Sequence, residues 1–201
     1  MHISEGVLSA PVLITGAILS AAGIGIGLKK MRYDKIPEVA VLSSAFFVAS
    51  LIHVPVGPSS IHLVLNGLLG ILLGWMAFPS IFVALSLQAL LFQFGGFTVL
   101  GVNTFNMALP ALIAYVIFYP LVKRKNLFLT ASAAFLAGMT GIAIGGILIA
   151  FALITTGESF TNVAKLILIT HLPVMFIEGI ITAFCVIFLK KVKPEILEVI
   201  R

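Results

Sequence analysis

No Asp, Glu, Lys or Arg interrupts this sequence between Glu38 and Lys123, and a second uncharged run lies between Lys125 and Glu158. An α-helix crosses the hydrocarbon core of a bilayer with about 20 apolar residues, so the first run has room for several spans. Charged residues make up only 9% of the chain, well below the share of about 25% that is usual in soluble domains. The sequence therefore predicts an all-α, polytopic membrane protein.

Glycine, proline and charged residues divide the apolar sequence into seven expected transmembrane helices. These helices cover residues 9–28, 37–52, 61–76, a fourth stretch that ends near 93, 104–122, 127–154 and 164–189. The sequence AFPS (77–80) is expected to form the turn between the third and fourth spans. We expect one transmembrane domain over residues 1–201, made of an N-terminal segment (1–8), a helical bundle (9–190) and a tail (191–201).

The positive charges of the sequence indicate how the spans are oriented. If the N-terminus lies outside, eleven of the twelve Lys and Arg residues fall on the cytoplasmic side and only Lys165 lies outside. This distribution follows the positive-inside rule, so we expect an outer N-terminus and a cytoplasmic C-terminus. The same count assigns the net charge of +5 to the orientation of the protein in the membrane, so no nucleic-acid partner is expected.

In this topology the four histidines, His2, His53, His62 and His171, all lie in the outer half. Histidine is the commonest metal ligand in proteins, so this grouping suggests a metal site. No positive charge precedes the first apolar run, which argues against a signal peptide. His2 is therefore expected to stay next to a terminal amine, and the alternative is that His2 is an ordinary exposed residue.

A terminal α-amine followed by His2 can act as a chelating group. The amine, the amide nitrogen of residue 2 and its imidazole Nδ1 form fused five- and six-membered rings around a metal ion, and one further imidazole completes a square of nitrogens. Planar nitrogen ligation favours Ni(II) or Cu(II), whereas zinc prefers tetrahedral sites. Because His2 is bulky, Met1 is expected to be retained.

Four segments of the sequence resemble the CbiM/NikM family, the substrate-binding membrane components of energy-coupling-factor transporters for cobalt and nickel. They are MHISEG, GPSSIHLVLNGLLGILLG, FGGFTVLGVNTFNM and THLPVMFIEGIITAF, in order along the chain. The resemblance implies that the Met1 amine, the amide and imidazole nitrogens of His2, and His62 hold the metal. One departure is Phe94, which stands where the family is expected to have a histidine before paired glycines, and this bears on the choice between cobalt and nickel.

The same resemblance implies a binding component that imports Ni(II) or Co(II) across a prokaryotic cell membrane, for example for cobalamin biosynthesis. The metal would be the transported substrate, and no organic cofactor is expected. A transmembrane coupling subunit and two ATP-binding cassette ATPases are implied as partner chains, and a small accessory membrane protein is a further candidate. The sequence has no HExxH, GxSxG or GxxxxGK[ST] motif, so no enzymatic activity is expected.

Further polar residues are candidates for contacts around the metal. Asn66 lies four residues after His62 and would share its face on a helix, either against the N-terminal segment or in packing between helices. Asn103 and Asn106 follow the glycine-rich connection, where they either contact the N-terminal segment or cap turns. His53 is interpreted as a loop residue rather than a ligand.

His171 and Glu178 are seven residues apart, on one face of the last expected span. A carboxylate inside a membrane is costly, so Glu178 either braces the bundle or His171, or takes part in transport. Cys185 lies in an apolar run and is expected to pack against lipid or a helix. Two other functions stay open: a haem protein with His62 and His171 as axial ligands, and a secondary transporter that acts without partner chains.

Overall fold

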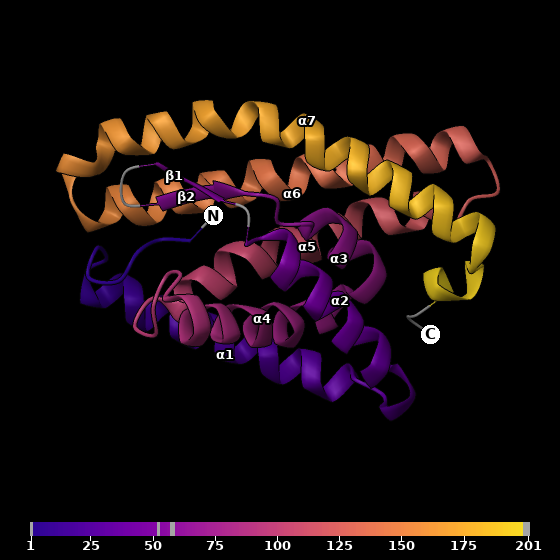
Figure 1. Cartoon of the computed structure of the whole chain (residues 1–201), viewed down its shortest axis with the longest axis horizontal. Coiled ribbons are helices and arrows are strands. Elements are labelled where there is room, and N and C mark those ends of the chain that lie inside the picture. The colour runs from indigo at the N-terminus through magenta and orange to yellow at the C-terminus, as the bar shows by residue number, and fades with distance from the viewer. Residues whose placement is uncertain (1, 52, 57–58, 199–201) are drawn as a thin grey trace.

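The computed structural model describes residues 2–51, 53–56 and 59–198, and these residues are nearly all helical (Figure 1). Within these ranges the α-helices are α1 (Ala10–Lys30), α2 (Ile36–Ala49), α3 (Asn66–Leu73), α4 (Ala77–Phe92), α5 (Leu100–Val122), α6 (Leu127–Thr156) and α7 (Thr161–Val192). Two short strands, β1 (His53–Val56) and β2 (Ser59–His62), lie between α2 and α3. Short 3-10 turns are η1 (Tyr33–Lys35), η2 (Gly74–Met76), η3 (Glu158–Phe160) and η4 (Pro194–Glu198).

Five helical segments of the described chain are long and apolar enough to cross a membrane. They are α1, α5, α6, the segment from η3 through α7, and the run from α3 through α4. The helices α1, α5, α6 and α7 begin and end within a few residues of the expected spans. By contrast, α2 has 14 residues, which is about 21 Å at 1.5 Å per residue. The protein is therefore helical and polytopic, while the number of seven spans stays a prediction.

The expectation of a continuous third span over residues 61–76 is wrong. The chain begins this stretch as β2, turns, and forms only the eight residues of α3 before η2. Gly74 has φ 52° and ψ −122°, a conformation that glycine adopts readily and other residues do not, and it separates α3 from α4. The expected turn at 77–80 is likewise wrong, because these residues form the first turn of α4.

A small β-hairpin lies within the otherwise nearly all-helical fold. Strands β1 and β2 pair antiparallel, and the Cα of His53 lies opposite that of His62 at one end of the ladder. The β-branched residues Val54, Val56 and Ile61 suit extended backbone. Since His62 ends β2 and Asn66 begins α3, these two residues do not share a helix face as expected.

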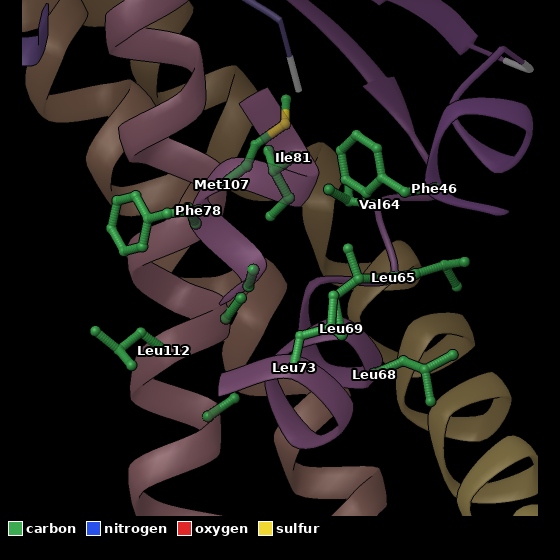
Figure 2. Packing of buried hydrophobic residues seen from close by; sticks show 14 of the residues in the cluster. Phe46, Val64, Leu65, Leu68, Leu69, Leu73, Phe78, Ile81, Met107 and Leu112 are labelled. Carbon is green, nitrogen blue, oxygen red and sulfur yellow. The ribbon is translucent and has the colours of Figure 1, made fainter. Parts of the chain in front are cut away.

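The short helix α3 lies at the centre of the bundle. Every residue of α3 is buried, and the helix packs against α5, α6 and α7. Figure 2 shows Leu69 and Leu73 of α3 in the cluster that also holds Met107 and Leu112 of α5. A Cβ atom on Gly70 would overlap the carbonyl of Ala111, so glycine is required where α3 meets α5. Because protein surrounds α3, this helix need not be as long as the bilayer is thick.

The basic residues that follow α1, α5 and α7 lie at one end of the molecule, on the right in Figure 1, and we call this the basic end. The turn between α6 and α7 lies at the opposite end. Lys190 of α7 donates to the carbonyls of Val122 and Arg124, which joins two of the basic segments. This arrangement is the one that the positive-inside rule requires of a single cytoplasmic face, although the orientation itself stays a prediction.

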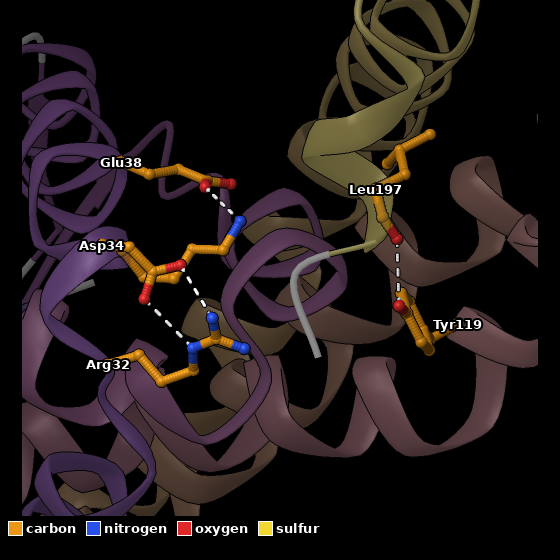
Figure 3. Close-up of polar contacts among 6 residues, drawn as sticks. Arg32, Asp34, Glu38, Tyr119 and Leu197 are labelled. Carbon is orange, nitrogen blue, oxygen red and sulfur yellow. Dashed lines mark hydrogen bonds and ion pairs between the residues drawn. The ribbon is translucent and has the colours of Figure 1, made fainter. Parts of the chain in front are cut away.

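Ion pairs and a hydrogen bond connect residues at the basic end (Figure 3). Arg32 pairs with Asp34 through two hydrogen bonds of 3.0 and 3.1 Å, and Lys35 Nζ lies 3.1 Å from Glu38 Oε2. The hydroxyl of Tyr119 donates to the carbonyl of Leu197 at 2.9 Å and ties η4 to α5. The Arg32–Asp34 pair is exposed, and exposed ion pairs contribute about 0–1 kcal/mol each, so this pair adds little to the stability of the fold.

Candidate metal centre

The N-terminal segment enters the bundle instead of lying on its surface. His2 is 5% exposed and Ile3 is 0% exposed. The backbone N–H of Ile3 donates to Asn103 Oδ1 at 2.9 Å, and Asn103 Nδ2 donates back to the Ile3 carbonyl at 3.1 Å. His2 is therefore not an ordinary exposed residue, and Asn103 of α5 contacts the N-terminal segment. Met1, the remaining expected residue of this segment, lies outside the described residues.

His2 and His62 meet inside the protein. Their ring centroids are 4.7 Å apart with an angle of 33° between the ring planes. His62 is 3% exposed, at the end of β2, so neither imidazole faces open solvent. The fold thus brings together two histidines that are 60 positions apart in the sequence, and their role as metal ligands stays a prediction.

Gln88 of α4 contacts Nε2 of the His2 ring. Gln88 Oε1 lies 2.7 Å from His2 Nε2, and Gln88 Nε2 donates to the Phe47 carbonyl at 3.1 Å and to Ser50 Oγ. The side chain of Gln88 is fully buried. The sequence analysis missed this residue, although a lone amide within an apolar run such as LSLQALLF is a sign of function in a membrane helix.

The backbone beside His62 sets which ring nitrogen carries the proton. His62 Nδ1 lies 2.9 Å from the carbonyl oxygen of Leu63. A carbonyl oxygen only accepts hydrogen bonds, so Nδ1 is the protonated nitrogen of a neutral ring and Nε2 bears the lone pair. Nε2 is thus the nitrogen of His62 that could bind a metal.

Glu178 of α7 holds the turn that follows His62. Its carboxylate accepts hydrogen bonds from the backbone N–H groups of Val64 and Leu65, the latter at 2.9 and 3.1 Å. Glu178 is 0% exposed, and Leu65 has a left-handed φ of 56°. A buried carboxylate requires such donors. Its partners are therefore these backbone groups, while His171 donates from Nδ1 to the Ile167 carbonyl at 2.6 Å.

The glycine-rich connection between α4 and α5 wraps around the N-terminal segment. Gly95 and Gly96 have φ values of 77° and 128°, and a Cβ atom on Gly96 would overlap the Glu5 side chain. Glu5 Oε1 accepts a hydrogen bond of 3.1 Å from the Thr98 N–H. The ring of Phe94, where the family resemblance leads us to expect a histidine, lies 6.3 Å from the ring of His2.

Several other expected residues are buried without joining the histidine pair. In the described part of the chain, neither side-chain polar atom of Asn66 has a hydrogen-bond partner, nor does Asn106 Nδ2 or His171 Nε2. The backbone of His53 lies in β1, not in a loop, and its side chain is outside what the structure describes. Cys185 is a free, half-buried thiol of α7.

Long apolar helices around a buried centre of imidazole and amide groups define an integral membrane protein with a nitrogen-rich internal site. The chain belongs to the CbiM family, since residues 2–196 match the family described as the cobalt uptake substrate-specific transmembrane region. Members of this family are membrane components of cobalt and nickel uptake, which confirms the resemblance drawn from the four sequence segments.

Individual relatives agree with this assignment. A Haemophilus influenzae protein, provisionally named a metal transport protein, is 43% identical over 98% of this chain and 97% of its own length. An Archaeoglobus fulgidus protein, provisionally named the fused nickel transport protein NikMN, is 34% identical over 98% of this chain and 68% of its own length. A crystal structure of a transition metal transporter superposes with a TM-score of 0.81 and 28% identity, over 96% of this chain and 93% of the other.

Proposed function

We propose that this protein captures Ni(II) or Co(II) through four nitrogens: the α-amine of Met1, the amide nitrogen and Nδ1 of His2, and Nε2 of His62. The observation that carries the proposal is the buried contact between the His2 and His62 rings, 4.7 Å apart. The Met1 amine enters as part of the proposal, because Met1 lies outside the described residues. The metal is the transported substrate of the protein, and no organic cofactor takes part.

The small number of side-chain ligands in the bundle supports a metal site that also uses main-chain nitrogens. Among the described residues no group of three or more His, Cys, Asp or Glu side chains could hold a metal ion. Two imidazoles alone make an incomplete ligand set, and two main-chain nitrogens bring it to four. Planar nitrogen ligation suits Ni(II), whereas the family description names cobalt, so both ions are candidate substrates.

The enclosed position of His2 and His62 requires movement for release. We place segment 1–8 as the metal-binding element, residues 9–190 as the bundle and residues 191–201 as a tail, with the N-terminus outside a prokaryotic cell membrane. Metal then enters from the outer face and leaves toward the basic end. Inward release is driven by separate chains, namely a transmembrane coupling subunit and two ATPases. A small accessory membrane protein is a further candidate partner.

The haem alternative has less support than the chelate. It requires His62 and His171 to face one another across a haem. The ring that lies against His62 is that of His2, and Nδ1 of His171 is engaged with the Ile167 carbonyl. The chelate uses His2, whereas a haem bound by His62 and His171 leaves His2 without a role.

A metal titration tests the proposed function. Isothermal titration of the purified protein with Ni(II) or Co(II) is expected to reveal one tight site, which both His2→Ala and His62→Ala abolish. The nickel-loaded protein should show the d–d absorption band of planar nitrogen ligation. His53→Ala serves as the matched histidine control and should keep the site. Tight binding that persists in both His2→Ala and His62→Ala would contradict the ligand set.

Replacing Asn103 tests the docking of the N-terminal segment. Asn103→Ala removes both hydrogen bonds to Ile3, which is about 2 kcal/mol at about 1 kcal/mol each. Since the docked segment carries the ligands, we expect nickel affinity to fall about 30-fold. Asn126→Ala is the control: it removes the N-cap of α6 and should lower stability by about 1 kcal/mol with no change in affinity. Equal affinity of wild type and Asn103→Ala would refute this role.

A further inference from the structure

Gln88 lies between helix α2 and the N-terminal segment, and it uses both ends of its amide. One end faces the Phe47 carbonyl at 3.1 Å and Ser50 Oγ, and the other faces His2 Nε2 at 2.7 Å. This side chain is 0% exposed, so bulk solvent does not reach it. The orientation of the amide, with its oxygen or its NH₂ group toward His2, therefore determines whether His2 Nε2 donates or accepts this hydrogen bond.

The surroundings of Gln88 allow only one orientation of the amide. The Phe47 carbonyl can only accept a hydrogen bond, so the group that faces it must be the NH₂ group. Ser50 Oγ donates its own proton to the Phe46 carbonyl at 2.7 Å, which leaves its lone pairs to accept from the same NH₂ group. Both neighbours on the α2 side are thus acceptors, and the oxygen of Gln88 must point to His2.

The amide orientation in turn selects the tautomer of His2. A carbonyl oxygen 2.7 Å from His2 Nε2 requires that Nε2 carry a proton. In a neutral imidazole the other nitrogen, Nδ1, then bears the lone pair. Nδ1 is the nitrogen that can close a six-membered ring with the amide nitrogen of the same residue, whereas Nε2 is too far from the backbone to do so.

The two histidines are therefore held in opposite tautomers. The Leu63 carbonyl keeps the proton of His62 on Nδ1, and Gln88 keeps the proton of His2 on Nε2. Each ring presents to the metal the nitrogen that the proposed ligand set needs.

We infer that Gln88 is a positioning residue, which sets the His2 tautomer and ring orientation for chelation before the metal arrives. The inference rests on the proposed function for its purpose, but the tautomer itself is a property of the metal-free protein. Metal-binding histidines commonly donate their second N–H to an oxygen acceptor, and loss of that acceptor lowers metal affinity about 10- to 100-fold. Here the acceptor is itself locked by Phe47 and Ser50, so it cannot turn to stabilise the wrong tautomer.

Nitrogen-15 NMR of the metal-free protein with labelled histidine tests the inference at alkaline pH, where the rings are neutral. The His2 signals are identified by their loss in His2→Ala. In wild type we expect a pyridine-type Nδ1 and a pyrrole-type Nε2, and in Gln88→Met we expect signals averaged between both tautomers. Nickel affinity of Gln88→Met should fall about 10- to 100-fold. The matched control is Gln93→Met, at an exposed position that ends α4, and it should keep both the signals and the affinity.

The outcomes separate this inference from the proposed function. A wild-type spectrum with a protonated His2 Nδ1, or with averaged signals, overturns the inference even if the metal binds tightly. This result needs only the wild-type protein, so it holds whether or not Gln88→Met folds. A Gln88→Met protein with unchanged tautomer and unchanged affinity also overturns it. A locked wild-type tautomer without any nickel or cobalt binding would instead contradict the proposed function and leave the tautomer assignment standing.

Discussion

Adding residues before Met1 is expected to abolish high-affinity binding of nickel or cobalt. An extension converts the proposed amine ligand into an amide and forces additional chain into a segment whose His2 is only 5% exposed. Structural metal sites with four ligands bind with about 10–16 kcal/mol, so one ligand is worth about 3 kcal/mol or about 100-fold in affinity. The loss should exceed this value because the extension also obstructs docking of the segment.

The experiment compares one protein before and after cleavage. A removable leader placed before Met1 should prevent nickel binding in isothermal titration, and proteolysis that regenerates Met1 should restore it. An extension of the same length after Arg201 provides a second control and should leave binding unchanged. Unaltered affinity with the leader in place would rule out the terminal amine as a ligand.

Removing the carboxylate of Glu178 is expected to destabilise the protein strongly. Glu178→Ala leaves the backbone N–H groups of Val64 and Leu65 without their acceptor inside the bundle. Each unsatisfied buried donor costs about 1–3 kcal/mol, so we expect a loss of about 2–6 kcal/mol in the free energy of unfolding. Because these donors lie two and three residues after His62, nickel affinity should decrease as well.

Thermal unfolding in detergent, followed by circular dichroism, measures this effect. Glu158→Ala is the matched control, because Glu158 is exposed at the start of η3, and its effect should stay within about 0.5 kcal/mol. Glu178→Gln keeps one acceptor oxygen and should fall between wild type and Glu178→Ala. A Glu178→Ala protein as stable as Glu158→Ala would show that the turn after His62 does not depend on this carboxylate.

Hydropathy locates the long helices well because each is an apolar run that ends at charged or turn-forming residues. Thus α1 ends at Lys30, and α6 begins directly after Asn126, whose side chain caps its first turn. The stretch between α2 and α4 is less predictable. Residues 61–76 have the length and apolarity of a membrane span. Periodicity alone does not distinguish a strand from a helix in a short apolar run, so the strand β2 could not be recognised in this stretch.

The residues of the candidate site likewise fall into those that the sequence predicted and those that it did not. Chelate chemistry and the family resemblance single out His2 and His62, since both depend on residue types in order along the chain. Neither points to Gln88, and neither identifies the backbone at Val64 and Leu65 as the partner of Glu178. These contacts join residues 86 and 113–114 positions apart.

Hydropathy, charge and residue identity can be evaluated locally along the chain. They were therefore enough to predict a membrane protein, to locate its basic segments and to single out the histidines. The short, enclosed helix α3, the hydrogen bonds of Glu178 to the turn after His62, and the contact of Gln88 with His2 became visible only in the folded molecule. A buried polar group takes its partner from the groups that the packed helices bring within hydrogen-bond distance, and packing of distant segments leaves no pattern in the local sequence.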